Sequence, residues 1–242
     1  MKTIHLNEII SNIRIPAWII LTLWLVCSCV SLAPVNTSFD SAKTLNKGQV
    51  EFSGNYSPYY LNAEDDNGNK VTEKVNDNFG FRFGYGIIDR LDLKFRYERM
   101  LPRLLEDKDV LDGVNYFALS PRYGIVKNRL AGGLDLGLYT YTMKQSNTSE
   151  SSFFISPKLA FTYPSGKKFD LTLSTKIDIF PSDQETIWGL NLGCGISSDL
   201  EKWALRPEIG FLKDLSNFSY YTWFNGGIAL VLKFNPGKAK SQ

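Results

Sequence analysis

The segment Lys168–Phe180, with the sequence KFDLTLSTKIDIF, alternates apolar and polar residues along its length. Phe169 and Leu171 fall on one side of this alternation, and Asp170 and Asp178 fall on the other. A side-chain period of two predicts a β-strand, because successive side chains of a strand point to opposite faces. The period alone does not say whether the apolar face lies against a protein core or against lipid.

Ten segments of this kind follow one another between residues 49 and 234. Most have about 11 to 14 residues, whereas strands of soluble sheets usually have about 5 or 6 and tilted membrane strands need about 9–11. An even number of long alternating segments predicts an all-β fold, a closed antiparallel transmembrane β-barrel of up-and-down topology. The expected strands cover residues 49–61, 77–87, 91–101, 114–126, 129–143, 152–163, 168–180, 186–198, 202–213 and 219–234.

The connections between these segments alternate between long and short. NAEDDNGNKVTEKVND and PRLLEDKDVLDG are long, whereas the intervening IDR, KN and PSGK are tight. Outer-membrane barrels have long extracellular loops and short periplasmic turns. A content of 14% aromatic residues and 19 glycines also suits many strands and turns. The pattern therefore favours the cell outer membrane, with the apolar face of each strand against lipid.

Two stretches, AKTLNKGQVEFSGNYSPYY and FGYGIIDRLDLKFRY, carry a resemblance to a known class of protein. They resemble the first strand and the Gly-x-x-Asp-Arg-Leu hairpin of small outer-membrane β-barrel proteins of Gram-negative bacteria, of the Bacteroidota type. The last strand resembles the carboxy-terminal signal of such barrels, although NPGKAKSQ follows it. The residues that match this barrel-insertion signal are Asn225, Gly227, Leu230, Leu232 and Phe234. The resemblance implies outer-membrane lipids and the barrel-assembly machinery as partners, and it indicates architecture without indicating an activity.

The amino-terminal region has the features of a secretory signal. Basic residues precede an apolar run at residues 17–26, which is shorter than the span of about 20 residues that a membrane helix needs. The sequence VCSC at residues 26–29 resembles the bacterial lipobox, in which the final cysteine receives lipid. We expect a signal peptide at residues 1–28 and lipidation at Cys29. An ordinary cleaved signal without lipid is the alternative.

The rest of the chain divides into three parts by composition. Residues 29–48 are small and polar and show no period, which predicts a lipid-anchored periplasmic tether. The β-barrel is expected at residues 49–235, and residues 236–242 form a short carboxy-terminal tail. After signal cleavage and acylation of Cys29, only Cys194 would remain as a thiol, so we expect no disulfide.

The inward positions of the expected strands carry charges of both signs. Unpaired charge in a poorly hydrated interior is costly, so we expect these side chains to form an ion-pair network that fills the lumen. A narrow, weakly selective polar channel is the alternative, although interiors of about eight strands are filled by side chains. The expected network consists of Glu51, Arg82, Asp92, Lys94, Arg96, Glu98, Arg122, Asp135, Lys158, Asp170, Lys176, Asp178, Arg206 and Glu208.

Little in the sequence points to catalysis. The sole histidine, His5, lies in the expected signal peptide, and acid–base catalysis near neutral pH most often uses histidine. We therefore expect no enzyme activity, no catalytic residue, no metal site and no cofactor. The balance of 27 basic and 25 acidic residues gives no field that would attract nucleic acid.

The expected function is a structural or complex-subunit role for a non-enzymatic outer-membrane barrel. A narrow, porin-like channel for small solutes is the alternative, and a lipocalin-like binder is the third reading. The connection PRLLEDKDVLDG is more apolar than an exposed loop needs, which suggests a protein partner at the extracellular loops.

Overall fold

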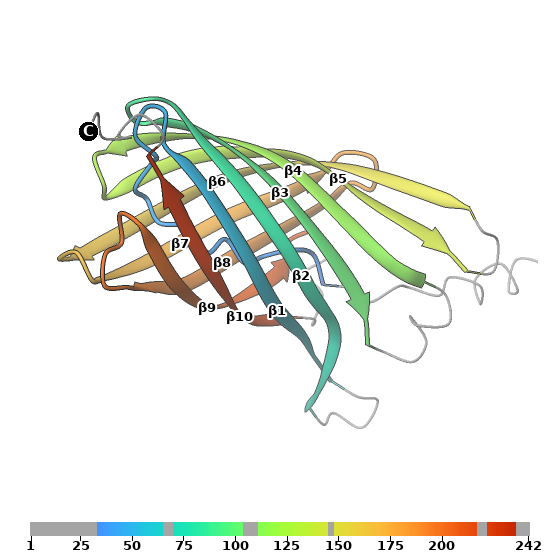
Figure 1. Ribbon diagram of the computed structural model, residues 1–242. Coiled ribbons are helices and arrows are strands. Elements are labelled where there is room, and N and C mark those ends of the chain that lie inside the picture. The colour runs from blue at the N-terminus through green and yellow to red at the C-terminus, as the bar shows by residue number, and fades with distance from the viewer. Residues whose placement is uncertain (1–32, 65–69, 104–110, 145–147, 217–221, 236–242) are drawn as a thin grey trace, which may run out of the picture. The chain divides into compact units, whose positions relative to one another are not determined.

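The computed structural model describes residues 33–64, 70–103, 111–144, 148–216 and 222–235. Ten antiparallel strands in these ranges pair in chain order and close into a barrel through β1 and β10 (Figure 1). The predicted fold class is therefore confirmed. The strands are β1 (Val50–Glu64), β2 (Lys70–Ile88), β3 (Leu91–Pro102), β4 (Leu111–Val126), β5 (Leu130–Met143), β6 (Ser149–Ser165), β7 (Phe169–Phe180), β8 (Glu185–Ile196), β9 (Trp203–Asp214) and β10 (Thr222–Phe234). No helix among the described residues is long and apolar enough to cross a membrane.

The two ends of the barrel differ in their connections. We call the end with the connections after β2, β4, β6 and β8 the turn end, and the opposite end the loop end. Arg90 and Asn128 adopt positive φ angles of 71° and 59° in two of the tight turns, a conformation that short hairpins require. The connections after β2, β4 and β6 are short, as the sequence indicated, whereas the connection after β8, residues 197–202, is longer than the one after β7, residues 181–184.

Some strands are longer at the loop end than the alternation predicted. β2 begins at Lys70, where the sequence pattern led us to expect residue 77, and its first residues pair with the end of β1 as far as Lys70 opposite Glu64. The side chains of residues 70–73 are all exposed, so neither face of this extension is distinguished by burial. An extension of this kind leaves no alternation in the sequence to detect.

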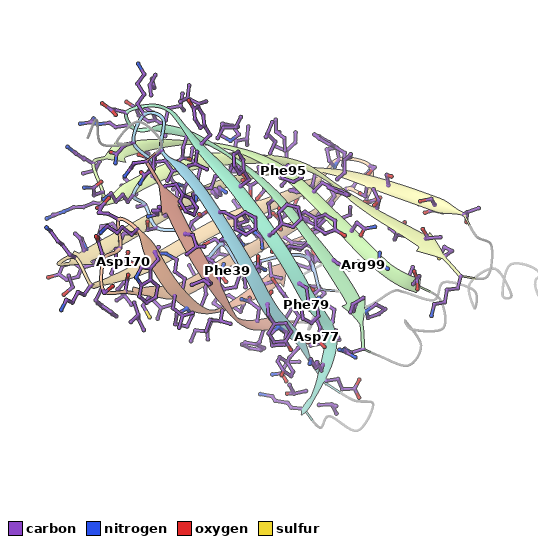
Figure 2. The ribbon with its side chains drawn as sticks, in the orientation of Figure 1. Phe39, Asp77, Phe79, Phe95, Arg99 and Asp170 are labelled. Atoms are coloured by element: carbon purple, nitrogen blue, oxygen red, sulfur yellow. The ribbon has the colours of Figure 1, made fainter. Side chains whose placement is uncertain are left out.

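The outer face of the barrel is apolar. Leu171 and Leu173 expose 42% and 46% of their surface, whereas Thr172 between them exposes 3%. Phe79 and Phe95 are likewise exposed on the outside of β2 and β3 (Figure 2). An apolar belt around a closed barrel with a polar interior is the arrangement of transmembrane β-barrels, so the chain belongs in the cell outer membrane, as predicted. A lipocalin-like binder would require the opposite faces, a polar outside and an apolar cavity.

The stretch before β1 departs from the tether expected at residues 29–48. Ala33–Leu45, which we call the luminal segment, is buried or half-buried inside the barrel (blue in Figure 1). Its backbone forms hydrogen bonds to inward side chains of the strands, which satisfies polar groups that a buried irregular chain would otherwise leave unpaired. Small polar residues suit this position as well as they suit a solvated tether, so composition does not distinguish the two. Residues 1–28, 29–32 and 236–242 lie outside the described residues.

Candidate functional site

Residues 46–49, which join the luminal segment to β1 and which we call the base of the segment, lie against β2 at the turn end. Gly48 donates its N–H to the carbonyl of Gly86 at 2.8 Å, and Gly86 donates to the carbonyl of Gln49 at 2.9 Å. A Cβ atom at Gly86 would overlap the carbonyl group of Asn46. The absence of a side chain at Gly86 therefore allows the segment to approach the barrel wall.

Asp92 of β3 links the segment to the charged lumen. The Arg122 guanidinium donates to both carboxylate oxygens, with Nε–Oδ1 at 2.9 Å and Nη2–Oδ2 at 2.7 Å. The same carboxylate accepts the N–H of Leu45 at 2.9 Å, and Arg122 also donates to the carbonyl of Ser41 at 3.1 Å. A two-bond Arg–carboxylate pair is the strongest common ion-pair geometry.

Asp40 brings a carboxylate from the segment itself into the network. Its Oδ1 atom lies 2.6 Å from Lys94 Nζ and 3.4 Å from Arg122 Nη1. Lys94 also pairs with Glu51 of β1. Asp40 was absent from the predicted network because the segment was expected outside the barrel, and a single carboxylate in a small polar stretch gives no local sign of burial.

The middle of the segment is held by Glu208 of β9. The Glu208 carboxylate accepts the N–H of Ser38 at 2.6 Å and the N–H of Phe39 at 2.7 Å. Phe39 adopts a positive φ of 48°, which is uncommon for a residue with a side chain. Its ring lies 5.2 Å from the Arg82 guanidinium carbon, within the range of a cation–π contact.

Asn36 connects the segment to β8 and β10. Its Nδ2 donates to Oδ1 of Asn191 at 2.9 Å and to Oδ1 of Asn225 at 2.7 Å, and Asn191 Nδ2 returns a bond to the Asn36 carbonyl at 3.0 Å. A Cβ at Gly189 would overlap the Asn36 side-chain oxygen. Three amide groups from distant parts of the chain therefore form one buried cluster.

The predicted barrel-insertion signal occupies both faces of β10. Asn225 points inward to Asn36, and a Cβ at Gly227 would lie 2.7 Å from the Phe39 ring, so both residues accommodate the luminal segment. The remaining residues, Leu230, Leu232 and Phe234, are partly or fully exposed along the strand. Recognition of these residues by the assembly machinery stays a prediction.

Aromatic residues surround the segment toward the loop end. Val35 donates its N–H to the Tyr139 hydroxyl at 3.0 Å, and Asn36 donates to the Tyr59 hydroxyl at 2.6 Å. Tyr139 packs against Phe154 in a tilted arrangement at a centroid distance of 5.2 Å, and the Phe154 ring is itself 6.0 Å from the Phe180 ring. These aromatic residues were not predicted as part of the interior, because only the charged inward positions were taken as its signal, although their inward positions follow from the same alternation.

The structure places all fourteen predicted network residues on the inner face of the barrel. Thirteen of them form ion pairs within 4.0 Å, and Glu208 binds the luminal segment as described above. The further pairs are Lys158 with Asp135 at 2.6 Å and Lys176 with Asp178 at 2.6 Å. Arg206 pairs with Asp170 at 2.7 Å near the turn end.

A cavity of about 40 Å³ remains between the segment and the wall, bordered by Arg82, Asp40 and Lys158 among others. Such a volume holds about three water molecules. The described residues contain no group of three or more His, Cys, Asp or Glu side chains that could hold a metal ion. Cys29 and His5 lie outside the described residues.

Comparison with known proteins finds likenesses of fold only. No protein-family model and no curated protein matches the chain. An outer membrane channel from Pseudomonas putida F1 shares 14% identity, with 83% of this chain and 100% of that chain covered at a TM-score of 0.49. The amino-terminal β-barrel domain of Pseudomonas aeruginosa OprF shares 12% identity, with 78% and 100% covered at a TM-score of 0.36.

OprG, an outer membrane protein from Pseudomonas aeruginosa, shares 11% identity, with 81% of this chain and 100% of that chain covered at a TM-score of 0.37. All of these proteins are outer-membrane barrels or barrel domains. At such values the likeness carries no statement about activity, and the fold assignment rests on the strand pairing of the chain itself.

Proposed function

We propose that this protein is a plugged, non-enzymatic barrel of the outer membrane with a structural or complex-subunit role. The observation that carries the proposal is that the luminal segment contacts every strand of the barrel wall. Its residues form hydrogen bonds to all ten strands, through Tyr59, Asn76, Asp92, Arg122, Tyr139, Thr162, Ser174, Asn191, Glu208 and Asn225 in strand order. A segment bound on every side functions as part of the interior.

The size of the barrel supports a filled lumen. Interiors of about eight strands are filled by side chains, and wide aqueous channels require about 16 strands. Ten strands leave room for one extended chain, and the luminal segment takes that room. The absence of catalysis remains part of the proposal, and it rests on the composition, in which His5 is the only histidine.

The proposal includes cleavage after residue 28 and lipidation of Cys29, as the VCSC motif indicates. It also includes a Bacteroidota-type origin and a protein partner at the extracellular loops. Intact mass spectrometry of the mature protein tests the first point. A mass that corresponds to an acylated chain beginning at Cys29 supports it, and an unmodified chain or a different first residue overturns it.

A narrow channel for small solutes is the second candidate function. The specific observation in its favour is the cavity beside the segment, which charged side chains from several strands border. In the observed arrangement this cavity is small, so conduction would require the luminal segment to move.

Single-channel recording in planar bilayers separates the two functions. We expect no conductance steps from the native protein. We expect steps from a variant that lacks residues 33–45, and also from Gly86→Ala, because the added methyl group would push the base of the segment off the wall. Gly54→Ala is the matched control, because a Cβ there meets no atom within 4 Å.

Steady conductance steps from the native protein, as large as those of the two variants, would overturn the plug and establish the channel. If the deletion of residues 33–45 and Gly86→Ala both give folded protein without conductance steps, the segment is not what closes the lumen. Retained resistance of the barrel to unfolding in detergent identifies the folded form for each variant.

A further inference from the structure

A second cavity lies at the turn end of the barrel. It has a volume of about 130 Å³, larger than the cavity of about 40 Å³ described above. Its border brings together Lys43 of the luminal segment, the tight turn after β6, and residues of β9 and β10 near their turn ends. The short connections of outer-membrane barrels face the periplasm, so this cavity lies on the periplasmic side.

The connection after β8 forms one wall of this cavity. Leu200 donates its N–H to the carbonyl of Lys167 at 3.0 Å, and Lys233 donates its backbone N–H to the carbonyl of Lys202 at 2.7 Å. These bonds join the connection to the tight turn after β6 and to β10. Leu200 and Glu201 both border the cavity, so backbone hydrogen bonds hold this wall in place.

Cations outnumber carboxylates around the cavity. Among the described residues, the charged ones at its border are Lys43, Lys167, Asp170, Glu201, Arg206 and Lys233. Arg206 donates two hydrogen bonds to Asp170, at 3.1 and 2.7 Å. Lys43 pairs with Glu201. Each carboxylate of the border is thus matched by one cation, and the charges of Lys167 and Lys233 make the cavity electropositive.

Lys233 is the cation with the weakest compensation, although its side chain is only 6% exposed. The closest carboxylate oxygen in the described part of the chain, Oε2 of Glu51, lies 4.0 Å from Nζ, and Lys94 pairs with the other oxygen of this carboxylate. The hydrogen bond that Nζ forms among the described residues goes to the carbonyl of Leu200 at 3.3 Å. An ammonium group has three N–H donors, and a buried charge is costly unless it is paired. An additional anion would therefore stabilise this site.

We propose that this cavity binds a phosphate group at the periplasmic end of the barrel. The cations belong to different elements, with Lys43 in the luminal segment, Lys167 in the turn after β6 and Lys233 in β10. A tetrahedral phosphate has oxygen atoms that face in several directions, whereas a planar carboxylate has two oxygens in one plane. A volume of about 130 Å³ holds about ten water molecules, so a phosphate group fits.

Phosphate at this position connects the plug to the wall. Lys43 belongs to the luminal segment, whereas Lys233 belongs to the strand that closes the barrel against β1. An anion between them adds an attraction that exists only while the segment is in place. Phosphate therefore stabilises the plugged form by linkage. The site itself does not depend on the structural role proposed above, because its charges are those of the folded chain.

Isothermal titration calorimetry of the full-length protein in an uncharged, phosphate-free detergent tests the proposal, with inorganic phosphate as the probe. Chloride at the same ionic strength is the reference anion. Lys233→Met removes the buried cation and keeps a long side chain. Lys202→Met is the matched control, because it removes the same charge from the connection after β8, where the Lys202 side chain is 77% exposed and lies outside the border of the cavity.

We expect phosphate to bind the native protein and Lys202→Met with equal affinity. We expect Lys233→Met to bind phosphate about tenfold to a hundredfold more weakly, because a hydrogen bond to a charged group is lost. Lys43→Met should weaken binding as well, and it replaces Lys233→Met if that variant does not fold. Equal affinities of the cavity variants and Lys202→Met, or a response to phosphate no larger than that to chloride, would overturn the proposal.

A second titration distinguishes free phosphate from the headgroup of a phospholipid. Dihexanoyl phosphatidylglycerol below its micelle concentration presents the phosphate as a diester. Tighter binding of this lipid than of inorganic phosphate assigns the site to a headgroup, and the reverse order assigns it to the free ion. In both cases Lys233→Met must weaken the binding, and lipid binding that Lys233→Met leaves unchanged would count against the cavity as the site.

Discussion

Asp92 illustrates how single residues hold the plug in place. Its side chain is fully buried, and it accepts two hydrogen bonds from Arg122 and one from the backbone of Leu45. The carboxylate therefore neutralises a cation of the wall and fixes the base of the segment at once. A buried charge is stable in such a site only while its partner is present.

Replacing Asp92 with alanine removes this partner. Arg122 then keeps the longer ion pair with Asp40, at 3.4 Å, and its hydrogen bond to the carbonyl of Ser41. We expect Asp92→Ala to lower the free energy of unfolding by about 3–5 kcal/mol, as for other broken buried pairs. Denaturant titration in lipid vesicles measures the change.

The control for Asp92→Ala is an exposed pair at the loop end. Asp112 lies 3.3 Å from Arg99, and its side chain is 73% exposed. Water and salt screen such a pair, so we expect Asp112→Ala to cost about 0–1 kcal/mol. Equal losses for the two variants would contradict a dry, filled lumen.

At the scale of elements, the strands could be predicted from sequence because their information is local. In β7, Leu171 and Leu173 face outward and Asp170 and Asp178 face inward, as the alternation indicated. In the structure, the charges of the lumen lie at inward positions of the same period. Opposite charges in a narrow interior pair for a general electrostatic reason, so the network followed from the strand assignment.

The luminal segment could not be predicted in the same way. Its binding partners are distant in sequence, as for Asn36 and Asn191, which are 155 residues apart. The segment has no period, since its residues contact many different strands and some of them, such as Asn36, contact more than one. Glycines that make room for it, such as Gly86 and Gly189, look like ordinary strand glycines until the three-dimensional contact is known.

At the scale of the whole molecule, two surfaces with opposite chemistry enclose one chain segment. The outer surface is apolar and suits lipid, while the inner surface is charged and suits a polar backbone. Because the segment continues directly into β1, the plug belongs to the same chain as the wall. Removal of the plug therefore requires a conformational change rather than dissociation.

The most direct test of the plug is a covalent link between the segment and the wall. Ser38 Oγ lies 3.2 Å from Ser174 Oγ of β7, whereas Leu173 points outward from the same strand. In a Cys194→Ala background, we expect the pair Ser38→Cys and Ser174→Cys to form a disulfide that peptide mapping by mass spectrometry detects. The pair Ser38→Cys and Leu173→Cys should form none. Absence of the first disulfide, or equal yields of both, would contradict the placement of residues 33–45 inside the barrel.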